Sequence, residues 1–475
     1  MDDSGFGIYK YYFKLLRTFG AFPYRVEGNA QKVGHYRDGL WKWLYYINYI
    51  GTSFGAAFQA VQLALTIQYE PDPINVIAQL CWMFAMGIPF ANQVYSLRNE
   101  DKIANSVDVW CQLERTVIGS SLRGLGNMPS GPLPTMSACH AAQNRLCKRT
   151  SAIYILMGIT GFIGMAMHYW FMPKFPAYLY QIIEGEDVTI KYLCGAFQLW
   201  MVILIWINIF ATEVIMVVAS GSLVHCLETL SYRGAVVMAN GQCDVPHLNE
   251  VLIKNWTAFE GKGMTGSGPP SKPQFNTGHT DKAQEKVLSA MNTESRAKAD
   301  AGGGKGGYDE DSMYLASVVQ NVVDIQYALD RYKDVEAVVD SLNNAFSKMV
   351  FAHQSIYMML MCTLFYTPIR HLKILPVEGS TLFAIIALYY CIRLFVFFPA
   401  MGRLNAQSHT FVESWMEGLR HIPRGKYAYE FYMHKLESCR KLAFDSGGFY
   451  LMQKGTVLTF VSIVTTHIIV LLQLY

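Results

Sequence analysis

Residues Thr459 to Tyr475, TFVSIVTTHIIVLLQLY, decide how the rest of the chain is interpreted. Their length and apolar content suit a helix inside a membrane, for which about 20 residues are needed. On a helix, residues at steps of three and four form one stripe of the surface, here Thr459, Ser462, Thr466, Val470 and Gln473. An uncharged, weakly polar stripe is stable in a membrane only against other protein or water. The pattern therefore predicts a helix that borders a narrow aqueous path.

The composition of the 475-residue chain is that of an integral membrane protein. Hydrophobic residues make up 52% of it and charged residues only 16%, against about 25% charged residues in an average soluble domain. The net charge of +3 gives no reason to expect a nucleic-acid partner. The ten cysteines are scattered, and their spacing predicts neither a disulfide framework nor a metal site.

Seven stretches are long and apolar enough to cross a bilayer. They lie near residues 41–68, 75–97, 150–172, 193–222, 346–368, 381–402 and 449–474. The connections at 98–149 and 403–446 hold seven Lys and Arg residues each, whereas those at 69–74, 173–192 and 369–380 hold none, two and two. Because cytosolic connections carry the excess of positive charge, we expect a cytosolic amino terminus and an extracellular carboxyl terminus. The sequence thus predicts an all-α membrane protein with seven transmembrane helices.

The same patterns divide the chain into six parts. Residues 1–40 are expected to be a cytosolic segment with a basic amphipathic helix at 9–19, which either lies on the membrane surface or packs on the protein. Helical extensions at 223–345 and 403–446 are expected to form a cytosolic anchor bundle, which either builds an oligomer or forms a core within one chain. Residues at about 258–312 have the composition of a disordered linker. Transmembrane helices 1–4, 5–6 and 7 then occupy residues 41–222, 346–402 and 447–475.

Few ionisable residues fall inside the predicted spans. Glu213 in the fourth span and Arg393 in the sixth both belong to the inner half of the membrane on this topology. A charge in a membrane is costly unless it is paired, so we predict a buried ion pair between them. Its role is to fix helix packing or, as the alternative, to act as a gating switch. The chain has no nucleophile motif, no paired carboxylates on one face and no nucleotide-binding fingerprint, so we expect neither an enzyme nor a cofactor.

Aromatic and large apolar residues concentrate in the outer halves of spans two, three, four and six. Apolar ligands bind in concave, aromatic-lined cavities that hold a few oriented polar groups. Tyr389 or Tyr390 is the preferred polar handle, because a phenol both stacks and donates a hydrogen bond. The candidate ligand-binding residues are Trp82, Met83, Phe162, Met165, Tyr169, Trp200, Leu204, Phe383, Tyr389 and Tyr390.

Two motifs carry a resemblance to a known family. The nine residues from Thr466 to Leu474 resemble the signature of the last helix of insect chemoreceptors, which is Thr-Tyr, five apolar residues and Gln-Phe, with His467 in place of the Tyr. The segment from Gly402 to Ser408 looks like the Gly-Asn-Arg-Leu-x-x-x-Ser region of odorant receptors. A long insertion before the fifth span and the predicted orientation are similar to the same family. The chain therefore resembles the insect odorant receptors.

The resemblance implies an odorant-gated, non-selective cation channel in the plasma membrane of a sensory neuron. It implies that volatile small-molecule odorants bind between the spans that carry the candidate pocket. It also implies that four subunits, as a homotetramer or as a heterotetramer with related subunits, surround one pore lined by the last helix. The pore and gate residues would be Thr466, Val470, Gln473 and Leu474, with Val470 and Leu474 as the apolar gate.

Other functions stay open from the sequence. A gustatory receptor channel of the same superfamily would have a more polar pocket than the one above. A metabotropic seven-helix receptor would place its carboxyl terminus in the cytosol. A transporter is disfavoured, because the spans show no internal duplication and no paired broken helices.

Overall fold

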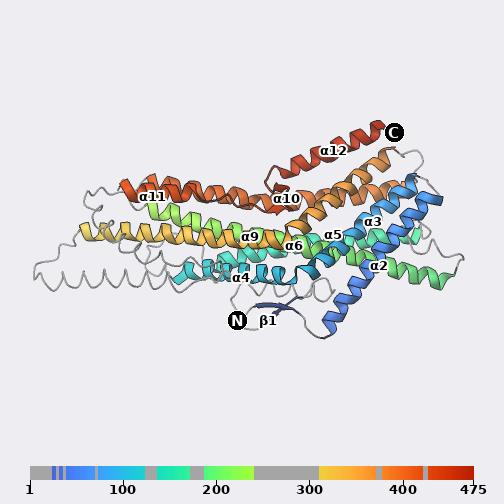
Figure 1. Cartoon of the computed structure of the whole chain (residues 1–475), viewed down its shortest axis with the longest axis horizontal. Helices are drawn as coiled ribbons and strands as arrows, with labels where there is room; N and C mark the ends of the chain where they lie inside the picture. The colour runs from blue at the N-terminus through green and yellow to red at the C-terminus, as the bar shows by residue number, and fades with distance from the viewer. Residues whose placement is uncertain are drawn as a thin grey trace, which may run out of the picture. The chain divides into compact units, whose positions relative to one another are not determined.

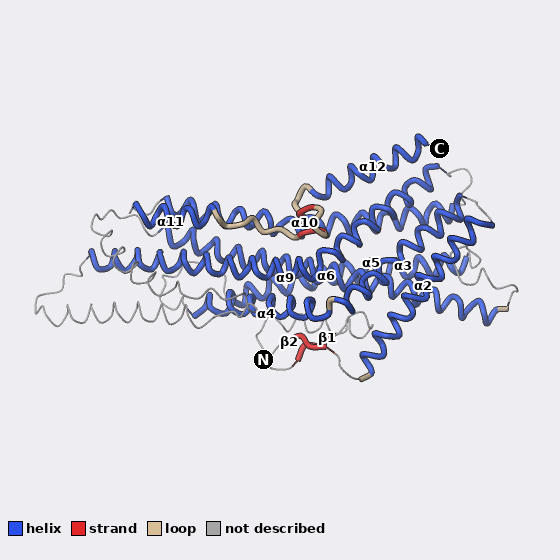
Figure 2. Tube along the Cα trace, viewed as in Figure 1, coloured by secondary structure: helices blue, strands red, loops and turns tan. Residues whose placement is uncertain are grey.

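A computed structural model describes the chain over residues 24–27, 32–35, 39–69, 73–123, 136–171, 187–239, 310–370, 377–420 and 426–474. Most of this chain is helical, with two short antiparallel hairpins (Figures 1 and 2). The predicted amphipathic helix at 9–19 lies outside the described residues, as does nearly all of the predicted linker. The elements are β1 (Tyr24–Glu27), β2 (Lys32–His35), α2 (Leu40–Tyr69), α3 (Pro73–Arg98), α4 (Glu100–Arg123), α5 (Met136–Phe171), α6 (Val188–Ala239), α9 (Glu310–Arg370), α10 (Val377–Arg420), α11 (Lys426–Glu437), β3 (Asp445–Ser446), β4 (Tyr450–Leu451) and α12 (Thr456–Leu474).

The prediction of an all-α membrane fold is confirmed. Within the described ranges, six helices are long and apolar enough to cross a membrane, and they belong to α2, α5, α6, α9, α10 and α12. The remaining predicted span corresponds to α3, which is 26 residues long but carries buried polar residues such as Gln79, Asn92 and Gln93. These residues lower its hydropathy, and Asn92 bonds to α6 instead of facing lipid. Such polar contacts between helices are typical of membrane bundles.

The chain forms two compact units. Unit 1 comprises residues 1–223, 338–406 and 442–475, and unit 2 comprises residues 224–337 and 407–441. In unit 1, α6 is the central helix, because side chains such as Phe210, Val214 and Leu223 are fully buried. The 18-residue apolar window of this helix is 83% buried, against 17% for that of α12. These values distinguish α6, which is enclosed by the rest of the chain, from α12, which is largely exposed.

Unit 2 has its own core, built from the extensions of the membrane helices and α11. The Tyr332 ring stacks on Phe411 with centroids 4.6 Å apart, and its hydroxyl donates to the Arg440 carbonyl over 2.8 Å. Ile325 and Leu329 are buried on the same stripe of α9. The i, i+4, i+7 spacing of these three α9 residues explains the packing, because it places them on one helical face.

The segment between α11 and α12 differs from the expectation of continuous anchor helices over 403–446. Residues 445–451 form a hairpin of β3 and β4, in which Asp445 pairs with Leu451 and Ser446 with Tyr450. Gly447 and Gly448 have φ of 64° and 83°, a conformation that favours glycine and suits a three-residue hairpin loop. The last helix therefore begins at Thr456, not at 449 as the apolar pattern predicted.

Candidate functional site

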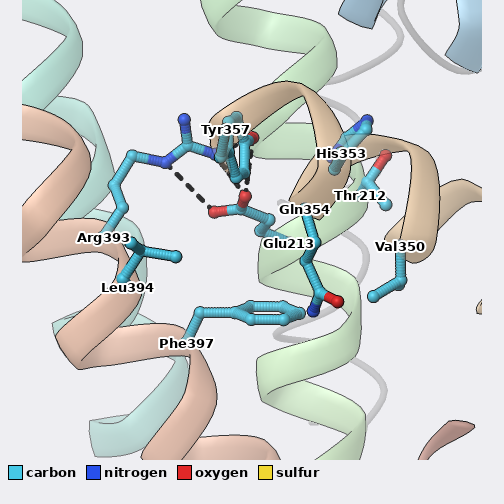
Figure 3. Close-up of a pocket in the computed structure, with 9 residues that line it drawn as sticks. All are labelled: Thr212, Glu213, Val350, His353, Gln354, Tyr357, Arg393, Leu394 and Phe397. Atoms are coloured by element: carbon cyan, nitrogen blue, oxygen red, sulfur yellow. Dashed lines mark hydrogen bonds and ion pairs between the residues drawn. The ribbon is translucent and has the colours of Figure 1, made fainter. Parts of the chain in front are cut away.

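Glu213 and Arg393, which the sequence singled out, meet in the interior of unit 1 (Figure 3). The guanidinium of Arg393 on α10 binds both carboxylate oxygens of Glu213 on α6, with 3.2 Å from Nε to Oε2. Arg393 is 1% and Glu213 4% exposed. A two-pronged contact is the geometry that an Arg fork and a carboxylate favour. The pair therefore has the geometry that a buried charge requires for compensation.

Two tyrosines complete the surroundings of the carboxylate. The hydroxyl of Tyr154 on α5 donates to Oε2 of Glu213 over 2.7 Å, and that of Tyr357 on α9 donates to Oε1 over 2.8 Å. Four helices, α5, α6, α9 and α10, thus meet at one carboxylate. We call Tyr154, Glu213, Tyr357 and Arg393 the ion-pair cluster. Because each member hydrogen-bonds to a group on a different helix, the cluster fixes how these helices pack.

The aromatic rings around Arg393 connect the cluster to the candidate ligand pocket. The Arg393 guanidinium carbon lies 4.5 Å from the ring centroid of Tyr357 and 5.5 Å from those of Tyr389 and Tyr390. The rings of Tyr357 and Tyr390 are themselves 5.3 Å apart. Contacts between a guanidinium and aromatic faces are attractive, more so away from water. The candidate ligand-binding residues Tyr389 and Tyr390 therefore contact the ion pair directly.

A second polar group lies next to the cluster, between α3, α6 and α9. His353 Nε2 lies 2.6 Å from Asn92 Oδ1, and Asn92 Nδ2 donates to the Asn208 carbonyl and to Thr212 Oγ1. Since the amide nitrogen of Asn92 faces two acceptors, its oxygen faces His353, whose Nε2 must then be the donor. His353 is thus a buried packing residue whose Nε2 bonds Asn92.

A small cavity joins the two polar groups (Figure 3). It leaves about 10 Å³ for the centre of a water molecule, which is roughly the space of one water. This cavity is too small for an odorant, so it is not a ligand pocket. Its lining consists of Thr212, Glu213, Val350, His353, Gln354, Tyr357, Arg393, Leu394 and Phe397.

Seven of the ten candidate ligand-binding residues fall into three groups. Met165 and Tyr169 form a cluster with Cys194, against which the partly buried Trp82 packs. Leu204 lies in a second cluster, with the partly buried Trp200 against it. Tyr389 and Tyr390 form the third group, beside Arg393. The other candidates are Phe383, which is buried, and Met83 and Phe162, which are partly buried.

Gln354 of α9 contacts both strands of the β3–β4 hairpin. Ser446 Oγ in β3 donates to Gln354 Oε1 over 2.7 Å, and the Tyr450 hydroxyl in β4 donates to the same oxygen. Ser446 and Gln354 are both buried. Next to them, the Phe449 ring stacks on Phe351 with centroids 4.3 Å apart. The hairpin that precedes α12 is therefore attached to α9 by polar and aromatic contacts.

The last helix presents its predicted stripe away from the other helices of unit 1. Val457, Phe460 and Val464 are the buried side chains of α12, and the Phe460 ring lies 5.6 Å from Phe398 on α10. The stripe lies on the opposite face of the helix, and its members Thr459, Ser462, Thr466, Val470 and Gln473 are exposed. The side chain of Leu474, the remaining predicted gate residue, lies outside the described ones. Figure 1 shows α12 in red at the edge of the membrane helices of unit 1.

Sequence reasoning missed the residues that support the charged pair and the hairpin. Tyr154, Tyr357, Gln354 and Tyr450 carry these contacts, and none was a candidate. A signal existed for two of them, since Gln354 and Tyr357 stand three apart on α9 and place polar groups inside an apolar span. Which partner each would meet depends on how the helices are rotated, which one sequence does not specify.

The described helices define the class of the fold: a bundle of membrane helices whose polar interior is organised around a buried ion pair. The structure is similar to that of the insect olfactory receptor OR5 from Machilis hrabei, with a TM-score of 0.66 and 10% sequence identity. The match covers 99% of this chain and 100% of that one. The structure of the same receptor in complex with eugenol gives a TM-score of 0.64 at 8% identity, with the same coverage. No family model and no curated protein sequence matches the chain. The chain therefore has the fold of an insect olfactory receptor.

Proposed function

We propose that this chain is a subunit of an odorant-gated, non-selective cation channel in the plasma membrane. Four copies, either identical or mixed with related subunits, would arrange their α12 helices around one pore. Volatile small molecules would bind among α3, α5, α6 and α10 and stabilise the open arrangement. A ligand can do this only to the extent that it prefers the open state over the closed one.

The exposed stripe of α12 is the observation that carries the proposal. A membrane helix that only packed on its own subunit would bury its hydroxyl and amide groups and expose its apolar residues. In α12 Val457, Phe460 and Val464 are buried, whereas Thr466 and Gln473 are exposed, as are apolar residues such as Leu458 and Ile469. A water-filled path between copies would give this stripe the environment that it lacks in one chain.

The uncharged character of the stripe bears on selectivity. Rings of carboxylates select cations in many channels, and α12 has no charged residue between Thr456 and Leu474. Val470 and Leu474, one turn apart near the carboxyl end, would close the path by excluding water, as apolar constrictions do. Weak discrimination among Na⁺, K⁺ and Ca²⁺ is expected to follow.

The similar receptor holds eugenol in one of its structures. We propose that this chain takes small apolar molecules of comparable size, with Tyr389 or Tyr390 as the hydrogen-bonding group. The tyrosines lie beside Arg393 and Tyr357, so a bound ligand would contact the ion-pair cluster. Eugenol is thus a sensible first probe, together with a panel of volatile aromatic and aliphatic compounds.

Neighbouring threonines provide a matched test. Thr465 and Thr466 are both exposed on α12, but only Thr466 belongs to the stripe, and the two point about 100° apart on a helix. In whole-cell recordings, a thiol reagent applied from outside should block the odorant-evoked current of Thr466→Cys and leave that of Thr465→Cys unchanged. The unmodified chain controls for its own ten cysteines.

Three outcomes would contradict the proposal. Equal sensitivity of both cysteine variants would show that the stripe does not line the path. Absence of any odorant-evoked current, from the chain alone and with a related co-receptor, would remove the channel function. An epitope tag at Tyr475 that stains only after permeabilisation would reverse the orientation and favour a metabotropic receptor.

A further inference from the structure

One helical turn of α9, residues 353–357, contacts both the ion-pair cluster and the hairpin that leads into α12. Tyr357 donates to Glu213 and its ring lies against Arg393. Gln354, three residues earlier on the same face, accepts hydrogen bonds from Ser446 and Tyr450. Both α9 residues line the cavity of Figure 3.

We infer that Gln354 is the positioning residue through which the ion-pair cluster moves the β3–β4 hairpin and, with it, the start of α12. The inference rests on the proposed channel function, because only there does a shift of α12 open a path. Tyr390 of the candidate pocket contacts Tyr357 at one end of this connection. At the other end, β4 ends at Leu451 and α12 begins at Thr456.

The side-chain oxygen of Gln354 accepts a hydrogen bond from each strand of the hairpin. Ser446 belongs to β3 and Tyr450 to β4, and the two strands pair at these residues. One side-chain oxygen thus holds both strands, so a movement of the 353–357 turn shifts them together. A contact to a single strand would instead allow the hairpin to twist.

Further contacts make the hairpin a stiff body that can transmit such a shift. The Asp445 carboxylate accepts from the Gly448 amide over 2.8 Å, and Met452 donates to the Phe444 carbonyl over 2.8 Å. A Cβ added at Gly447 would come within 2.9 Å of Phe351, so the loop lies directly against α9. Such close packing resists gradual deformation and favours movement as a unit.

Hydrogen exchange of the purified full-length protein tests this connection without any ligand or current. Tyr357→Phe removes one hydrogen bond from Glu213 and should speed exchange of the Phe449 and Met452 amides, which the hairpin protects. The expected acceleration is roughly two- to thirty-fold, the range of measured couplings through a protein. In a Gln354→Leu background, Tyr357→Phe should add nothing further. Additive effects, or an unchanged hairpin in Tyr357→Phe, would overturn the inference.

Asn343 supplies the matched control. It sits on α9 and holds the same segment, because its side chain bonds the Asp445 amide over 2.9 Å and the Ala443 carbonyl over 3.2 Å. It does not belong to the 353–357 turn. Asn343→Ala should speed hairpin exchange by itself yet leave the effect of Tyr357→Phe intact. Loss of that effect in Asn343→Ala as well would mean that any loosening of the hairpin breaks the connection, and Gln354 would have no special role.

Two further variants keep the test decisive. If Tyr357→Phe does not fold, Tyr154→Phe can replace it, because it removes another hydrogen bond to the Glu213 carboxylate, this one from α5. Ser446→Ala with Tyr450→Phe cuts the connection from the hairpin side and should reproduce Gln354→Leu. Where odorant-evoked current exists, Gln354→Leu, which lies outside the ion-pair cluster, should bind odorant normally but open less. Failure of the proposed function would instead abolish current in the unmodified chain and leave the exchange result standing.

Discussion

Gly402 of α10 lies against the backbone of Lys454, just before α12 begins. A Cβ placed on Gly402 would come within 2.4 Å of the Lys454 nitrogen and 2.5 Å of the Gln453 carbonyl carbon. Backbone atoms at such distances cannot give way as a flexible side chain would. The glycine is the first residue of the motif that the sequence analysis connected with odorant receptors, and its position gives that motif a physical reason: close approach of α10 to the start of the last helix.

Gly402→Ala should therefore destabilise unit 1. Overpacking of this kind costs about 1–3 kcal/mol, which would lower the unfolding temperature measured in detergent. Gly161→Ala on α5 is the control, because a Cβ there meets nothing within 4 Å and alanine is the better helix former by roughly 1 kcal/mol. An unfolding temperature of Gly402→Ala equal to or above that of the unmodified protein would contradict the close approach.

The ion pair should show strong non-additivity on mutation. Glu213→Gln leaves the buried guanidinium of Arg393 without a counter-charge, and Arg393→Met leaves the Glu213 carboxylate without one. Each substitution should therefore lower the free energy of unfolding by about 3–5 kcal/mol. The double variant removes both charges and should be more stable than either single one. Thermal unfolding of the four proteins in one detergent measures the coupling. Costs that simply add would mean that the two charges do not stabilise each other.

The membrane helices and the two charged residues could be predicted because each follows from a local rule. Apolar length predicts a span, and a charge inside a span demands a partner. Glu213 and Arg393 were predicted at the same level of the membrane, where few other ionisable side chains were available as partners. The span of α3 was recognised from the same rule, although its buried Asn92 and Gln93 make it less apolar than the others.

The hairpin and the polar network could not be predicted, because they depend on tertiary contacts. Gly447 and Gly448 fall at the start of the predicted last helix, whereas their positive φ values close a hairpin loop. The strands on either side are only two residues long, so they leave no alternating pattern to recognise. Gln354 and Tyr450 became functional candidates only when the fold brought them together across about a hundred residues.

Unit 2 offers a pH-dependent test at Cys439. Burial, helped by the Glu336 carboxylate, raises the pKa of this thiol from about 9 to about 11, and its Sγ donates to the Lys435 carbonyl over 3.4 Å. The thiolate fraction at pH 8 should then be roughly a hundredfold below that of the unfolded chain. Site-resolved maleimide labelling should find Cys439 slow at pH 8 and faster as the pH rises towards 11.

The same shift sets the sign of its effect on stability. The folded protein holds the Cys439 proton more tightly than the unfolded chain. The stability that this proton adds to the fold is therefore complete below about pH 9 and is lost as the pH rises through about 11. Glu336→Gln removes the neighbouring negative charge, so it should lower the thiol pKa and speed labelling at pH 8. Labelling of Cys439 at the rate of the unfolded chain would contradict the packed environment described for it.

Val470 is the residue at which the proposed gate can be tested in isolation. If an apolar ring at this position keeps the closed path dry, Val470→Ser should favour water in the path and raise the current in the absence of odorant. A shift of about 1.4 kcal/mol would increase the ratio of open to closed channels about tenfold. Ile469→Ser is the matched control, because Ile469 is 49% and Val470 45% exposed, but Ile469 lies off the stripe. Whole-cell recordings should find a raised basal current in Val470→Ser alone. Leak of equal size in both variants would indicate disturbed packing of α12 instead of an opened gate.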